Sequence, residues 1–282
     1  MQRVSRFDKF MRWFVINAIL MLLMAVFIIP FLYMTTGGFK YQNEIASSSV
    51  SLIPRVPTVT NYQTIFREFP IPRIMFNSFF IALAVTATNL FFCSLAGLAY
   101  ARFRFPGRDK LFSLALLTMM IPMQAILVPL FIIMANLNWI NTYQAIILPG
   151  AIGAFGIFFM RQYIGSSVPS ELLDAARIDG CSEFGMYWMV VLPIIKPALV
   201  TLGLILFMNA WNDYLWPMIM LNDNVMYTLS LTVGIAGLRN YLLNYGEKLA
   251  AATLAAWPPV IIFFIFRKQF IEAIMAGALK GG

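Results

Sequence analysis

The chain has 282 residues, of which 61% are hydrophobic and only 11% are charged, and its mean hydropathy is +0.79. Too little charge remains to cover a soluble domain of this size, so the composition excludes a water-soluble globular protein and predicts a membrane protein. The chain contains no histidine, the commonest general base and metal ligand, and we therefore expect no catalytic residue and no metal site. We also expect no cofactor on this chain.

Six apolar runs follow one another along the chain, each long enough to cross about 30 Å of hydrocarbon. We expect helices at 13–33, 77–101, 111–134, 143–160, 198–220 and 249–266. The first run is longer than a signal-peptide core and no clean cleavage site follows it, so we interpret it as a membrane anchor. The predicted fold class is an all-α membrane protein with six transmembrane helices. It divides into 1–72 (N-terminal tail, first helix and outer segment), a five-helix core at 73–267, and a C-terminal tail at 268–282.

Lysine and arginine are distributed unevenly over the two sides of this topology. Fourteen of the 20 lie on the side that holds both termini, and the other side has only Lys40, Arg55, Arg67, Arg73, Arg239 and Lys248. Cytoplasmic loops collect Lys and Arg, so we expect a multi-pass protein of the cell membrane with both termini in the cytoplasm. The net charge of +8 then reflects topology, and we do not expect nucleic-acid binding.

The predicted spans are almost free of ionisable side chains. Asp213, toward the outer end of the fifth span, is the exception, which argues against coupling to protons or sodium ions. Amides and aromatic rings suit a path for a polar, neutral solute, although amides also bond between helices and rings also anchor at interfaces. The candidate substrate-path residues are Asn89, Gln124, Asn209, Trp211, Asn212 and Tyr214.

The segment between the fourth and fifth predicted spans, on the predicted cytoplasmic side, has the pattern of two short helices. We expect Ser170 to cap the first, with Glu171 and Asp174 near its N-terminus, where the helix dipole favours negative charge. Gly180 is expected to end that helix, and a second is predicted to begin at Ser182. The pair would form a knob for a groove on a partner protein. The alternative, a helix lying on the membrane surface, is disfavoured because anionic lipid repels its acidic residues.

This segment reads Asp174-Ala175-Ala176, then three residues, Gly180, nine residues, and Val190-Val191-Leu192-Pro193. The spacing resembles the EAA loop of permease subunits in binding-protein-dependent ABC importers, which usually have Glu at the place of Asp174 and often Ile at that of Val190. Further stretches resemble the carbohydrate branch of that family, the maltose and oligosaccharide type. They are ARFRFPGR at 101–108, MIPM at 120–123, AARIDG at 175–180, WNDYLWP at 211–217 and AGALKGG at 276–282.

The resemblance implies a type I ABC importer permease fold with a coupling loop at 169–193 that docks an ATPase subunit. The docking residues it implies are Glu171, Asp174, Ala175, Ala176, Arg177, Asp179, Gly180, Leu192 and Pro193. The implied partners are a second, paralogous permease, two ATPase subunits that bind ATP and Mg, an extracellular solute-binding protein, and a di- or oligosaccharide as substrate. Candidate contacts to the binding protein are Arg239, Asn240 and Tyr241. The chain has no Walker A loop, so nucleotide binding falls to the partner and we expect a transport subunit rather than an enzyme.

Two alternatives stay open. One is an ATP-independent channel or carrier, which the uncharged interior and the coupling loop oppose. The other is an ABC importer for a different polar solute, such as glycerol 3-phosphate, a monosaccharide, a polyamine or an amino acid. The spans contain no Lys or Arg to pair with an anionic cargo, unless the partner permease supplies the site.

Overall fold

The computed structural model describes residues 6–47, 51–238 and 244–278, and in these ranges every regular element is helical. Contacts divide the chain into two compact units, Met1–Phe69 with Ile235–Trp257 (unit 1) and Pro70–Gly234 with Pro258–Gly282 (unit 2). The elements are α1 (Arg6–Gly37), α2 (Gln42–Ile45), α3 (Thr60–Glu68), α4 (Ile71–Arg102), α5 (Arg108–Thr118), α6 (Met123–Asn136), α7 (Tyr143–Ile147), α8 (Ala154–Ser167), α9 (Ser170–Ile178), α10 (Glu183–Met186), the π-helix η1 (Tyr187–Val191), α11 (Leu192–Asn212), α12 (Leu215–Met220), α13 (Leu229–Leu238) and α14 (Tyr245–Ala278).

Four helical segments of the described residues are long and apolar enough to cross a membrane: Met11–Gly37, Ile71–Arg102, Glu183–Asn212 and Tyr245–Lys268. The pair α5 and α6 makes a fifth if it is one span bent by 99°. These findings confirm an all-helical protein with four to five apolar spans, and the count of six stays a prediction. They also place α14 through Ala278, so that residues 268–278 continue the last helix.

Two of the predicted spans are not continuous helices. The run predicted at 111–134 is interrupted because Pro122 has an extended backbone (ψ 137°) and a proline disfavours helix at the residue before it. The run predicted at 143–160 is interrupted between α7 and α8. There the side chain of Asn89 donates a hydrogen bond to the Gly150 carbonyl at 3.0 Å, which satisfies a backbone group that the helix leaves free.

The fifth predicted span begins much earlier than its hydropathy suggested. Helix continues from Glu183 to Asn212 through α10, η1 and α11, so the predicted boundary at 198 lies inside it, and residues 215–220 form the separate helix α12. The second short helix predicted from Ser182 is therefore the first turn of this long segment. Ser182 is its cap, with the hydroxyl accepting a hydrogen bond from the Gly185 amide at 3.1 Å.

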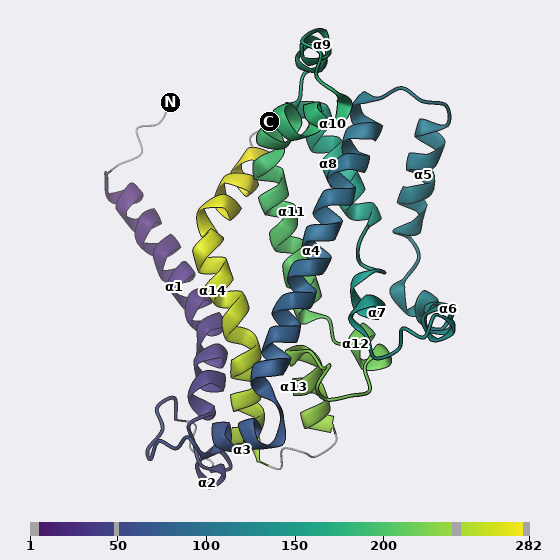
Figure 1. Cartoon of the computed structure of the whole chain (residues 1–282). Helices are drawn as coiled ribbons and strands as arrows, with labels where there is room; N and C mark the ends of the chain where they lie inside the picture. Colours follow the sequence, from purple (N-terminus) through teal and green to yellow (C-terminus); the bar gives the residue numbers. More distant parts are fainter. Residues whose placement is uncertain (1–5, 48–50, 239–243, 279–282) are drawn as a thin grey trace. The chain divides into compact units, whose positions relative to one another are not determined.

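Helix α4 forms the centre of unit 2, where it packs against α8 and α11 (Figure 1). Gly97 allows the close approach to α8, because a methyl group at this position would lie 2.6 Å from Cβ of Met160. A buried hydrogen bond of 2.7 Å between the hydroxyls of Ser94 and Tyr187 joins α4 to η1. A hydrophobic cluster that includes Cys93, Leu98, Met160, Leu173, Tyr187 and Leu202 fills the space between these helices.

At the end of unit 2 away from α9, α7 and α12 lie beside the segment 221–228 (Figure 1). Asn77, which is fully buried, donates to the carbonyls of Val225 and Tyr227 at 2.8 and 3.0 Å. The side-chain oxygen Oδ1 of Asn77 accepts a hydrogen bond from the Tyr143 hydroxyl at 2.6 Å. One side chain of α4 thus fixes a segment that is distant in sequence.

Unit 1 contains α1, whose apolar surface is almost entirely uncovered by the rest of the chain. Because the helix is hydrophobic on all sides, its environment is lipid or another protein. The segment after α1 is folded around Lys40, which is 1% exposed, donates to the Ser51 carbonyl and lies 4.9 Å from the centre of the Tyr33 ring. Asn61 reinforces this fold by donating to the Gly38 and Lys40 carbonyls.

Candidate functional site

Helix α9 stands at one end of unit 2, beyond the ends of α4 and α8 (Figure 1). The chain enters it through Pro169, whose extended backbone (ψ 144°) separates it from α8. The prediction that Ser170 caps this helix is wrong: Pro169 occupies the cap position, Ser170 is already helical, and no side chain caps the first turn. Glu171 lies in the first turn, as predicted.

The C-terminus of α9 is closed by Gly180, as the sequence predicted. Gly180 has φ +80°, a left-handed conformation that favours glycine. Its amide donates to the Arg177 carbonyl at 3.0 Å, and the next amide, of Cys181, donates to the Ala176 carbonyl at 2.9 Å. These two bonds form a Schellman motif, which satisfies the last carbonyls of the helix and turns the chain toward α10.

One face of α9 is anchored and the other is free. Leu173 is 2% exposed and belongs to the hydrophobic cluster, and Ala176 packs against it. On the outer side Ala175 is exposed, Leu172 is 43% exposed and Ile178 is 87% exposed. The exposed Leu172 and Ile178 were not selected from the sequence, because their helical spacing alone does not tell which apolar face meets the protein.

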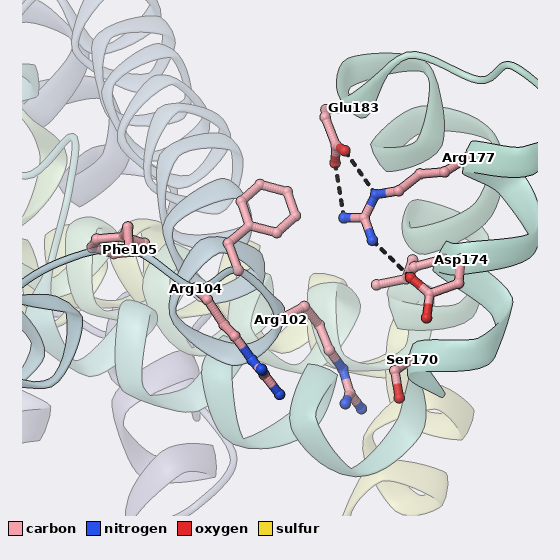
Figure 2. Close-up of a pocket in the computed structure, with 9 residues that line it drawn as sticks. Arg102, Arg104, Phe105, Ser170, Asp174, Arg177 and Glu183 are labelled. Atoms are coloured by element: carbon pink, nitrogen blue, oxygen red, sulfur yellow. Dashed lines mark hydrogen bonds and ion pairs between the residues drawn. The ribbon is translucent and has the colours of Figure 1, made fainter.

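Arg177 joins α9 to α10 by ion pairs (Figure 2). Its guanidinium donates to Asp174 at 2.9 Å and to Glu183 at 2.8 Å. The hydrogen bond to Glu183, with the charges of both carboxylates, raises the pKa of Arg177 above its ordinary value. The Asp174 pair lies within α9, and the Glu183 pair joins α9 to α10. Both pairs are solvent-exposed, so each stabilises the fold only a little.

A groove of about 610 Å³ separates α9 from the turn that follows α4. Residues 102–105 form one wall, and Ser170, Leu173, Asp174, Arg177 and Glu183 form the other. Arg102 also donates to the Ile164 and Gly165 carbonyls at 3.3 and 2.9 Å, where it occupies the C-terminus of α8. The turn after α4 was not predicted as part of the site, although its ARFRFPGR sequence marks it as basic.

The remaining predicted docking residues differ in how exposed they are. Asp179 is exposed in the turn after α9. Leu192 packs against the hydrophobic cluster, and Pro193 is exposed in the first turn of α11. Leu192 therefore has a packing role in this chain, whereas Asp179 and Pro193 are open to a partner.

The predicted substrate-path residues lie on several different elements. Asn89 and Trp211 are buried: Asn89 binds the Gly150 carbonyl, and the Trp211 ring lies edge-on to Phe79 at 4.8 Å. Gln124, Asn209 and Asn212 are exposed, and Asn212 donates back to the Met208 carbonyl at 2.8 Å. The predicted binding-protein contacts Arg239, Asn240 and Tyr241 lie outside the described residues.

Tyr214 differs from the other path residues. Its ring packs against Gly234, where a methyl group would lie 2.2 Å from Cε2. Its hydroxyl is buried and has no hydrogen-bond partner within the described part of the chain. An unpaired buried hydroxyl is costly, which makes Tyr214 the one path residue whose polar group has a reason to seek a partner among the described residues.

Several apolar helices of spanning length, with the exposed helix α9 at one end of unit 2, define a multi-span membrane protein. The family model of binding-protein-dependent transport system inner membrane components matches residues 93–275. The chain belongs to this family.

Three relatives agree with the family over most of the chain. It is 36% identical over 258 residues to the arabinooligosaccharides transport system permease protein AraQ of Halalkalibacterium halodurans, covering 90% of this chain and 91% of that protein. It is 34% identical to the lactose transport system permease protein LacG of Rhizobium radiobacter, with 90% and 91% covered. Identity to the sn-glycerol-3-phosphate transport system permease protein UgpE of Yersinia enterocolitica is 34%, with 73% of each covered.

The fold also matches a solved structure. A chain of a bacterial ABC transporter involved in the import of the acidic polysaccharide alginate superposes with a TM-score of 0.79, covering 96% of this chain and 99% of that one. The two sequences are 23% identical. This similarity supports the type I permease fold and says nothing of the cargo.

Proposed function

We propose that this chain is a permease subunit of an ATP-driven ABC importer and that it carries a sugar, most simply a di- or oligosaccharide. The family supports a transport component, and the arabinooligosaccharide and lactose relatives support a sugar. The relative named for sn-glycerol-3-phosphate favours the alternative of a smaller, anionic cargo. The partners we propose are a paralogous permease, two ATPase subunits that bind ATP and Mg, and an extracellular binding protein.

The observation that carries this proposal is the exposed side of α9. Ile178 is apolar and 87% exposed, and it lies on a helix that the buried Leu173 holds in place. Such an exposed apolar side chain is unfavourable in water and suits a groove on a partner protein. We assign that partner as the ATPase subunit, since this chain has no nucleotide-binding motif of its own. Closure of the ATPases would then move α9, and α9 would move α8 and α11.

Ile178→Asp and Ala175→Trp test this assignment, because both side chains are exposed and the changes should not disturb the fold. We expect the ATPase subunits to be lost on purification while the permease still inserts in the membrane. Val56→Asp is the matched control, since Val56 is also exposed, at 60%, but lies in unit 1. An intact, pumping complex with both α9 variants would refute the docking role.

Ala176 and Gly180 are less suitable for this test, although the sequence pattern points to them. Ala176 packs against the hydrophobic cluster, and Gly180 has a positive φ. A bulky substitution at either position would strain the permease itself, so loss of the ATPase would have two explanations.

The proposed topology has six spans, with α9 and both termini in the cytoplasm. Ile53→Cys and Ile178→Cys test it in a Cys181→Ser background, because both positions are well exposed, at 78% and 87%. A membrane-impermeant maleimide applied to intact cells that express the permease without the ATPase subunits should label position 53 and should label position 178 only after permeabilisation. The reverse pattern would overturn the orientation.

For the sugar path, the exposed amides of Asn209 and Asn212 are open to a polar solute, and the buried Tyr214 hydroxyl, which has no partner among the described residues, would bind one only if the path opened there. Tyr214→Phe, Asn209→Ala and Asn212→Ala should lower uptake while basal ATP hydrolysis continues. Uptake kinetics equal to those of the unmodified protein would exclude the residue concerned. A panel of sugars and sn-glycerol 3-phosphate, tested against the co-purified binding protein, would separate the two cargo classes.

A further inference from the structure

The groove between α9 and the turn after α4 has more guanidinium groups than carboxylates. Arg102, Arg104 and Arg177 line it, against Asp174 and Glu183. Both carboxylates are already paired with Arg177. The charges of Arg102 and Arg104 therefore have no acidic counterpart in the groove.

Arg104 is exposed and takes part in none of the ion pairs or side-chain hydrogen bonds formed among the described residues. Arg102 uses one nitrogen for the carbonyls of α8, but its Nε is buried and lacks a hydrogen-bond partner in the same part of the chain. Arg102, Arg104 and Ser170 all line the groove, and in Figure 2 the two arginine side chains extend in the same direction. The exposed guanidinium of Arg104, which has no acceptor among the described residues, is therefore free to bind one.

Helix α9 adds to this preference for negative charge. Ser170 is its first residue, so the free amides of the first turn and the positive end of the helix dipole lie at the same wall of the groove. Two arginines, a hydroxyl and a helix N-terminus form a donor set that matches a carboxylate, which binds guanidinium groups in bidentate geometry.

We propose that this groove is a carboxylate-binding site and that it receives an Asp or Glu side chain of the ATPase subunit that docks on α9. The inference rests on the proposed function and extends the docking surface to the turn after α4. An anionic lipid headgroup has the same charge, but Asp174 and Glu183 in the groove, with Glu171 and Asp179 beside it, would repel a lipid surface. A single carboxylate on a protein can instead bind next to Arg104 and leave those acids paired or in water.

The test uses Arg104→Ala, Arg104→Lys and Arg104→Glu in the assembled transporter, because Arg104 is exposed and Arg102 also caps α8. In lipid nanodiscs at low salt, Arg104→Ala should weaken association of the ATPase subunit by about tenfold, the effect of losing a hydrogen-bonded charge pair. Arg104→Lys should bind the ATPase subunit more tightly than Arg104→Ala, because lysine keeps the positive charge but lacks the two parallel N–H donors of a guanidinium group. Arg104→Glu should bind more weakly than Arg104→Ala, because it reverses the charge. The loss should shrink as salt is added.

Lys110→Ala is the matched control, because Lys110 shares a neighbouring depression with Arg104 but does not line the groove. Equal effects of Lys110→Ala and Arg104→Ala would show a general charge effect and overturn the proposal. An Arg104 effect that appears in nanodiscs with anionic lipid but not in neutral ones would assign the groove to lipid and also overturn it. Normal docking of all Arg104 variants together with failure of Ile178→Asp would refute the groove and leave the proposed function intact. Normal docking of every variant would refute both.

Discussion

The contact between α4 and α8 gives a quantitative test of the packing. At Gly97, a methyl group would lie 2.6 Å from Cβ of Met160, 2.9 Å from the Arg161 nitrogen and 2.9 Å from the Met160 carbonyl carbon. These atoms belong to the backbone of α8 or are bonded to it, so no side-chain rotation relieves the clash. Gly97→Ala must therefore push the two helices apart at this contact.

We expect Gly97→Ala to lower the free energy of unfolding by about 1–2 kcal/mol. Overpacking a tight core costs about 1–3 kcal/mol, and alanine recovers up to about 1 kcal/mol of helix propensity. Gly165→Ala is the matched control, since Gly165 lies in α8 with nothing within 4 Å of the added methyl group, and it should be neutral or stabilising by about 0.5 kcal/mol.

Unfolding of the purified permease by SDS in mixed micelles, followed by tryptophan fluorescence, measures the difference between the two variants. Because α8 leads into α9, the Gly97→Ala protein should also bind the ATPase subunits less tightly. Equal unfolding curves for Gly97→Ala and Gly165→Ala would show that the helices do not meet as described.

Three further predictions concern particular bonds. Ser94→Ala should lower the free energy of unfolding by about 1–3 kcal/mol, because it leaves the buried Tyr187 hydroxyl without this partner. Tyr187→Phe should cost less, about 0.5–1.5 kcal/mol, because the Ser94 hydroxyl still donates to the Phe91 carbonyl at 3.0 Å. The double variant should cost less than their sum, as a double-mutant cycle would measure, and additive effects would contradict the bond. Asn77→Ala should speed amide hydrogen exchange across 221–228, read by mass spectrometry, whereas unchanged exchange would mean that Asn77 does not fix this segment. The hydrogen bond from the Arg108 guanidinium holds the pKa of Asp109 below its ordinary value. The pairing therefore persists above the unfolded pKa and is lost as pH falls through the folded pKa; an NMR titration midpoint at or above that of a free aspartate would disprove it.

The site itself was predicted in part. Gly180 as the helix end, Glu171 in the first turn and a helix start at Ser182 follow from local backbone chemistry, and the structure confirms each of them, with Ser182 as the cap. The cap predicted at Ser170 was wrong because Pro169 already fixes the extended residue before the helix. The bridge from Arg177 to Glu183 joins two helices across a turn, so it could not be derived from the spacing of either helix.

The sequence alone determined that most of this protein lies in lipid and where the short helix α9 ends. Long apolar runs and scarce charge require lipid, and helix caps and stops act over a few neighbouring residues, so a reader of the chain can place both. Only the tertiary structure decided where the helices break and which side chains remain free. Asn89 supports the interruption before α8 from another helix, and packing of Leu173 is what leaves Ile178 exposed. These outcomes depend on contacts between segments far apart in the chain, which hydropathy and spacing do not encode.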